Sequence, residues 1–202
     1  MPVRKNTSPA ASKGKTAGKT TAEGSVKNVS SSREGKTFCT HTFGPFYRPD
    51  SEILILGSFP SVKSREANFY YGHPQNRFWK ILAAYFKDSV PGSTEEKSAF
   101  LASHKVALYD VIDSCWIKGS SDSSITDPQL TDLAPIIRGT KIDGRIFTNG
   151  KTAFRLYEKY TRAKTGIPAR LLPSSSPANA AFSLDKLAAL WGEAFRKAGF
   201  YG

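Results

Sequence analysis

The sequence has 202 residues, 39% of them hydrophobic, which is enough for one packed domain of ordinary size and a tail. No apolar run approaches the length of a transmembrane helix and none follows the basic N-terminus, so we expect neither a membrane span nor a secretory signal. The net charge of +12 favours a polyanionic partner such as nucleic acid; the alternative is a basic chain that is merely soluble.

The cysteines and histidines give little from which to build a metal site. Cys39 and Cys115 lack metal-ligand spacing, and the three histidines are scattered. A disulfide framework is not expected in a chain of this length, which suits a reducing compartment. We therefore expect a cytoplasmic protein, associated with the nucleoid if the host is prokaryotic, that needs no cofactor.

Residues 1–36 are predicted to be a disordered basic tail. They contain eight Lys or Arg and two Glu, and valine is their only bulky apolar residue apart from the initiating Met. Such a tail suits nucleic-acid binding, and a solubilising extension is the alternative.

The remaining chain alternates strands and helices. Continuous apolar or β-branched runs predict strands, and helical spacing of apolar residues predicts helices. Phe78, Trp79, Leu82 and Phe86 have this spacing and are more typical of core than of a site. The predicted strands are 52–58, 105–112, 143–150 and 169–174, and the predicted helices are 76–87, 93–104, 127–139, 151–163 and 183–199.

Local signals set several helix ends. Ser93 with Glu96 three residues later forms a capping box, and Ser183 is the expected cap of the last helix. Pro128 is placed in the first turn of the helix 127–139, with Gly139 just past its end, and Gly199 ends the last helix.

The alternation predicts an α/β fold with a mostly parallel sheet and helices on both faces. Active sites of such sheets lie at the carboxyl ends of the strands. Four segments should meet there: residues 57–77, 109–116, 148–152 and 172–180.

These segments carry rings and amides rather than acid–base groups. Residues 57–79 alone hold seven aromatic or imidazole rings and two Asn. The sequence has no glycine-rich phosphate loop, nucleophile elbow or carboxylate cluster. A flat heterocycle could stack on such rings while Asn or Asp contacts its edge. Some of these residues also have a purely structural interpretation: His73 beside Pro74 can hold its loop, and "PSSSPAN" can be a plain turn.

Three motifs together resemble the uracil-DNA glycosylase superfamily, and within it most closely the hypoxanthine-DNA (deoxyinosine) glycosylase branch. They are "LGSFPS" after the first strand, "YYGHPQNRFW" before the next helix and "LLPSSSPAN" near the end. The resemblance covers about residues 40–200. It implies a three-layer α/β/α sandwich around a four-stranded mostly parallel sheet, with residues 37–202 as the catalytic domain of a monofunctional base-excision repair glycosylase.

The resemblance also implies roles for individual residues. In most branches the third position of "GSFPS" is Asp or Asn, whereas here it is Phe59, which cannot orient a water by hydrogen bonding. Asn76 is therefore the expected catalytic residue, with Asn68 a weaker candidate. The expected base-binding residues are Phe59, Tyr71, His73, Asp110 and Asn149, and the expected DNA-binding residues are Ser58, Ser61, Lys151, Ser174, Ser175, Ser176 and Asn179.

The expected substrate is DNA that contains a deaminated base, bound by a monomer. Hypoxanthine is favoured, and uracil, xanthine and a mismatched thymine stay open. A second hypothesis is a noncatalytic nucleic-acid-binding module with the same fold, which Phe59 supports. A third is a hydrolase of free nucleosides, which the basic charge argues against.

Overall fold

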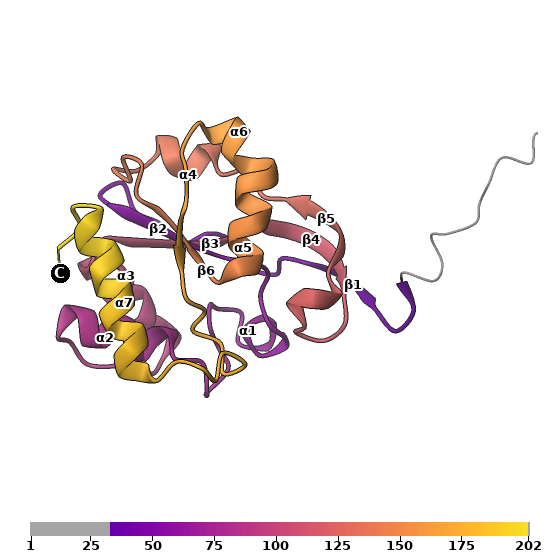
Figure 1. Ribbon diagram of the computed structural model, residues 1–202, viewed down its shortest axis with the longest axis horizontal. Helices are drawn as coiled ribbons and strands as arrows, with labels where there is room; N and C mark the ends of the chain where they lie inside the picture. The colour runs from indigo at the N-terminus through magenta and orange to yellow at the C-terminus, as the bar shows by residue number, and fades with distance from the viewer. Residues whose placement is uncertain (1–32, 202) are drawn as a thin grey trace, which may run out of the picture.

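The structure, a computed structural model, describes residues 33–201. Its centre is a parallel sheet of four strands in the order β3-β2-β6-β7 (Figure 1). The strands are β2 (Ile53–Gly57), β3 (Val106–Asp110), β6 (Ile146–Asn149) and β7 (Arg170–Leu172). Each lies inside a predicted strand, so the predicted sheet is confirmed.

Helices cover both faces of this sheet. Side chains alternate along β2, and all of them are buried. Ile53 and Ile55 belong to a core with residues of α2 (Phe78–Phe86), α3 (Thr94–Ser103) and α7 (Leu184–Lys197). Leu54 and Leu56 pack on the opposite face with residues of α4 (Ala134–Arg138) and α5 (Lys151–Leu156). Figure 1 shows the two helix groups on opposite sides of the sheet, so the three-layer α/β/α sandwich is confirmed.

The local helix signals mostly hold. Ser93 Oγ accepts from the Glu96 backbone N–H (3.1 Å), and Glu96 Oε2 accepts from the Ser93 N–H (3.2 Å), so the capping box is present. Ser183 Oγ caps α7 by accepting from the Lys186 N–H (3.2 Å). The predicted helix 151–163 is α5 followed by a π-helical segment, η3 (Tyr157–Thr161), and α6 (Arg162–Thr165). A short helix, α1 (Val62–Glu66), was not predicted.

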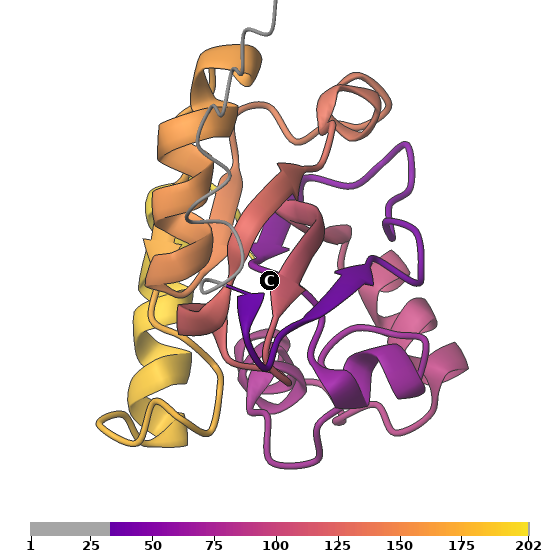
Figure 2. The same ribbon diagram turned by 90° about the vertical axis from the view of Figure 1, so that its right-hand side faces the viewer.

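A second, antiparallel sheet of three strands was also not predicted. It contains β1 (Thr37–Thr40), β4 (Ile112–Ile117) and β5 (Thr126–Leu130) in the order β1-β4-β5, and Figure 2 turns this side of the molecule toward the viewer. Cys39 lies directly opposite Cys115 in the β1–β4 register, and both thiols are free. Burial raises the pKa of the Cys115 thiol to about 11, which keeps that thiol protonated.

The prediction of one helix over residues 127–139 is wrong in its first half. Pro128 lies in β5, which is an edge strand. An edge strand pairs with a neighbour on one side only, so a proline, which has no backbone N–H, can be tolerated there. The helix of this segment is α4, with Pro135 in its first turn and Gly139 at its end. A proline therefore does mark the first turn of the helix in this segment, but it is Pro135 and not Pro128.

The N-terminal end of the described chain is fixed to the second sheet. The Arg33 guanidinium lies over the Trp116 ring (4.7 Å) and pairs with Asp127 (2.8 Å). Residues 1–32 of the predicted tail lie outside the described residues. Within residues 33–201, no helix has both the length and the apolar character needed to cross a bilayer.

Candidate nucleobase pocket

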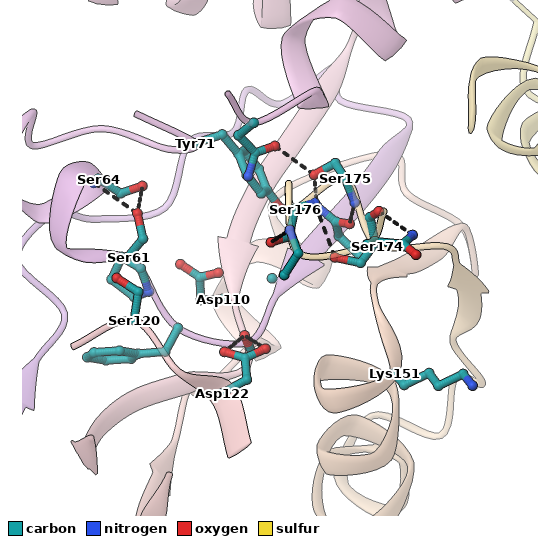
Figure 3. A pocket seen from close by; sticks show the side chains of 18 of the residues that line it. Ser61, Ser64, Tyr71, Asp110, Ser120, Asp122, Lys151, Ser174, Ser175 and Ser176 are labelled. Atoms are coloured by element: carbon teal, nitrogen blue, oxygen red, sulfur yellow. Dashed lines mark hydrogen bonds between the residues drawn. The ribbon is translucent and has the colours of Figure 1, made fainter. Parts of the chain in front are cut away.

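A cavity of about 960 Å³ lies at the carboxyl ends of the parallel strands (Figure 3). Its walls come from the segments that follow β2, β3, β6 and β7, as predicted for a parallel sheet. The loop between β4 and β5 supplies a further wall with Ser120–Ser123. Sequence reasoning missed this wall because it depends on the unpredicted second sheet.

The structure brings the predicted site residues together, with one exception. The cavity is lined by Ser58, Phe59, Ser61, Tyr71, Asn76, Asp110, Asn149, Lys151, Ser174, Ser175, Ser176 and Asn179. His73 is not among the lining residues, and its Nδ1 accepts from the Gln75 backbone N–H (3.2 Å). That contact fits the alternative role of holding the loop. Asn68 is exposed and also lies outside the lining.

Asp110 ends β3 and presents a buried carboxylate to the cavity. Its Oδ2 lies 2.9 Å from Nε2 of His41, and the two side chains are only 7% and 2% exposed. The carboxylate also lies close to the backbone of β2, because a Cβ added at Gly57 would fall 2.1 Å from Asp110 Oδ1. Glycine is therefore required at position 57. Oδ2 is engaged by His41, so Oδ1 is the oxygen that can accept from a ligand.

Tyr71 is one of the aromatic residues of the wall, which also include Phe43, Phe59, Tyr70 and Phe182. Its ring stacks on Phe78 at a centroid distance of 3.8 Å and an interplanar angle of 13°. The backbone of Tyr71 has φ +50, a conformation that non-glycine residues rarely adopt, which marks the position as constrained. Burial, with a smaller contribution from the Asp110 charge, raises the pKa of the Tyr71 phenol far above its usual value. The phenol is therefore neutral.

Asn76 belongs to a network of polar side chains. Its Oδ1 accepts from the Phe78 backbone N–H (3.0 Å) and from Ser175 Oγ (2.8 Å). Asn149 holds the same serine, since its Nδ2 donates to Ser175 Oγ (2.8 Å) and its Oδ1 accepts from the Ser175 N–H (2.9 Å). Both acceptor positions of the Asn76 carbonyl are thus occupied, and its amide NH₂ is the group left for a ligand.

Arg77, which sequence reasoning overlooked, holds the loop that carries the serines. Its guanidinium donates to the carbonyl oxygens of Ser175 (3.3 Å), Ser176 (2.6 Å), Asn179 (3.0 Å) and Phe182, and its backbone N–H donates to Ser175 as well. The cation is thus used inside the protein to shape residues 175–182. Its position directly after Asn76 in "QNRFW" is a signal that could have drawn attention to it.

Asp122 is a second carboxylate in the cavity wall that the sequence did not reveal. It belongs to the short turn η2 (Asp122–Ser124), and both of its oxygens lie 2.8 Å from the donating Ser58 hydroxyl. Removal from water raises the pKa of Asp122, while the Ser58 hydrogen bond opposes this shift and the Asp110 charge adds to it. Figure 3 shows Asp110 and Asp122 between Ser61 and Ser64 on one side and Ser174–Ser176 on the other, with Lys151 pointing away.

Fold and site together indicate the kind of ligand that the cavity can bind. A three-layer α/β/α sandwich holds, at its carboxyl edge, a cavity that combines stacked rings, amides and a carboxylate. Such a set suits a flat polar heterocycle, whose faces meet rings and whose edge meets hydrogen-bonding groups.

Comparison with known proteins agrees with a cavity for a flat heterocycle such as a nucleobase. The Uracil DNA glycosylase superfamily pattern matches residues 45–197. A hypoxanthine DNA glycosylase of Methanosarcina barkeri is 33% identical over 162 residues, which cover 77% of this chain and 97% of the relative. One of the same name from Methanosarcina acetivorans is 34% identical over 138 residues, covering 68% of this chain and 86% of the relative.

A solved structure matches the fold as well. A Methanosarcina acetivorans protein named as a uracil DNA glycosylase, determined by solution NMR, superposes with a TM-score of 0.61 at 31% identity. The match covers 75% of this chain and 96% of that one. The chain belongs to the uracil DNA glycosylase superfamily.

Proposed function

We propose that the protein is a monofunctional DNA glycosylase that removes hypoxanthine from DNA and leaves an abasic site. The observation that carries the proposal is the Asp110 carboxylate at the cavity, held through Oδ2 with Oδ1 left for a base. The names of the two Methanosarcina relatives favour the same base.

Asp110 gives a physical basis for choosing a deaminated base. A carboxylate accepts hydrogen bonds only, and hypoxanthine offers an N1–H where adenine presents an acceptor lone pair. Uracil offers an N3–H and is the second candidate substrate. The base reaches the pocket after flipping out of the duplex, which costs less for a poorly paired base.

Asn76 is the proposed catalytic residue, acting through its amide group. When the N-glycosidic bond breaks, its electron pair leaves with the base, water adds to the cationic C1′ of the sugar, and the proton released by that water goes to the departing base or to solvent. A fixed N–H donor to the developing negative charge on the base lowers the barrier. The carbonyl oxygen of Asn76 already accepts hydrogen bonds from Ser175 and Phe78, so it is not free to hold a water. We therefore assign the role to the amide NH₂.

DNA itself would be bound by the polar rim. In this proposal, Ser174 and Ser176 on the loop shaped by Arg77 contact phosphates, and Lys151 adds positive charge at the start of α5. We propose a monomer as the active form. The basic net charge of the chain predicts affinity that falls with salt.

The test is a single-turnover assay on labelled duplexes that contain one hypoxanthine or one uracil. We expect wild type to cleave the hypoxanthine duplex and Asn76→Ala to lose about 10²-fold or more in rate, the scale reported for one donor to a developing charge. Gln75→Ala is the matched control, since Gln75 is exposed and outside the cavity.

Each other result changes the conclusion in a defined way. Cleavage of uracil alone would keep the superfamily activity and replace the base. Full activity of Asn76→Ala with loss in Asn68→Gly would move the catalytic role to Asn68. DNA binding without any product would favour the noncatalytic module, with Phe59 as its cause.

A further inference from the structure

His41 contacts the pocket residue Asp110 from outside the four segments that sequence analysis brought together, without lining the pocket itself. It follows β1, and its backbone N–H donates to the Asp113 carbonyl (2.7 Å), which continues the β1–β4 pairing. This pairing carries the imidazole to Asp110, 69 positions later in the chain. The second sheet, which lies at one side of the molecule in Figure 1, thus positions a side chain against a residue of the candidate site.

The surroundings of the imidazole restrict its protonation. Its Nδ1 is buried and has no hydrogen-bond partner within the described chain. The centroid of the imidazole ring lies 4.5 Å from that of Phe43 and 4.8 Å from that of Tyr109. A proton on Nδ1 would leave a buried N–H without an acceptor, which costs more than a bare lone pair. The remaining proton therefore sits on Nε2 and is donated to Asp110.

Among the described residues, three titratable groups face the ring. The Asp110 carboxylate lies at Nε2 and accepts the hydrogen bond that Nε2 donates, and the other two are the phenols of Tyr70 and Tyr109. Burial raises the pKa of both phenols, so they stay protonated.

Resting on the proposed function, we propose that His41 is a positioning residue that holds the Asp110 carboxylate through Oδ2, with Oδ1 directed at the flipped base. The neutral imidazole donates one hydrogen bond to Oδ2 and neutralises no charge. The pair as a whole keeps one negative charge, which is what selects a base edge with an N–H over one with a lone pair. A protonated imidazole would weaken this selection.

Two substitutions separate the hydrogen bond from packing. His41→Phe keeps a flat ring in the aromatic surroundings and removes the donor, whereas His41→Gln supplies an amide N–H near the place of Nε2. We expect His41→Phe to lower the single-turnover rate on the hypoxanthine duplex about tenfold or more, the scale of a hydrogen bond to a charged group. His41→Gln should recover most of this loss.

A double-mutant cycle with Asp110→Asn links the effect to its partner. His41→Phe should cost little further rate in the Asp110→Asn background. Equal losses in His41→Phe and His41→Gln, or a full tenfold loss on top of Asp110→Asn, would overturn the proposal. Melting temperatures of all variants separate a loss of fold from a loss of positioning.

A readout without substrate keeps the inference distinct from the proposed activity. The ¹⁵N spectrum of the imidazole in wild-type protein should show the neutral form with the proton on Nε2, and Asp110→Asn should shift that signal. An imidazolium or an Nδ1–H form would overturn the proposal even if hypoxanthine is cleaved. Wild type without any glycosylase activity would refute the proposed function, and the spectrum would still decide how His41 holds Asp110.

Discussion

At the scale of single residues, the site depends on close contacts that leave no spare volume. Gly57 and Asp110 end adjacent parallel strands and face each other in register, and the carboxylate occupies the space that a side chain at position 57 would need. The oxygen that we propose for recognition of the base is therefore held against the backbone of the neighbouring strand.

Gly57→Ala should displace Asp110. The added methyl group would lie 2.1 Å from Asp110 Oδ1, so the carboxylate or the strand must move. We expect a loss of about 1–3 kcal/mol in unfolding free energy, typical of overpacking, together with loss of cleavage. Thermal unfolding and the single-turnover assay measure the two effects.

Gly44→Ala is the control for this substitution, because a Cβ there meets nothing within 4 Å. The penalty of Gly57→Ala should shrink in an Asp110→Ala background. An equal penalty in both backgrounds would mean that something other than the carboxylate opposes the methyl group.

At the scale of elements, signals local in sequence were predictable and pairings distant in sequence were not. The capping box at Ser93 and the cap at Ser183 need only the residues of one turn, and both are present. The strand β1 is stabilised by pairing with β4, more than seventy residues later in the chain, so the residues of β1 alone did not predict it.

The candidate site divides in the same way. Parallel topology alone places Asn76, Asp110 and Asn149 at one edge of a sheet, and they do line one cavity. His41 and Asp122 come from the antiparallel sheet and its β4–β5 loop, which no local pattern indicated. Their contribution could be found only from the three-dimensional arrangement.

The loop after β7 is predicted to depend on Arg77. Arg77→Met removes the donors to four carbonyl oxygens while keeping an unbranched side chain. We expect a loss of about 2–4 kcal/mol in unfolding free energy, since hydrogen bonds to a charged group contribute about 1.5–3 kcal/mol each and do not add fully. Hydrogen exchange at residues 174–182 should rise together with the loss of cleavage.

Arg155→Met is the matched control, because Arg155 is exposed on α5 away from that loop. Unchanged exchange in the Arg77 variant would show that the loop keeps its shape through Asn149 and the serines alone.

At the scale of the whole molecule, the charge is divided between the folded domain and the N-terminal segment. Residues 1–32 hold six Lys or Arg and one Glu, whereas Arg33 contacts Trp116 and Asp127 and belongs to the domain. A deletion that tests the segment should therefore end at residue 32.

Removal of residues 1–32 should leave the melting temperature unchanged and weaken binding to undamaged duplex at low salt. Each phosphate contact that is lost makes the negative slope of log K against log salt shallower by about 0.9. Binding titrations between about 50 and 200 mM salt measure this slope. A slope equal to that of the full chain would identify the segment as an inert extension, and a lower melting temperature would mean that it packs on the domain.

The order of strands has a consequence for how the protein is made. In the parallel sheet β3-β2-β6-β7, β2 is synthesised first but lies between β3 and β6. One edge of β2 therefore has no partner strand until β6, which begins at Ile146, has been synthesised. The cavity begins with Phe43 and closes with Phe182, near the two ends of the folded domain. A nascent chain therefore has a complete cavity wall only after Phe182 has been added, and a chain that terminates before this residue lacks part of that wall.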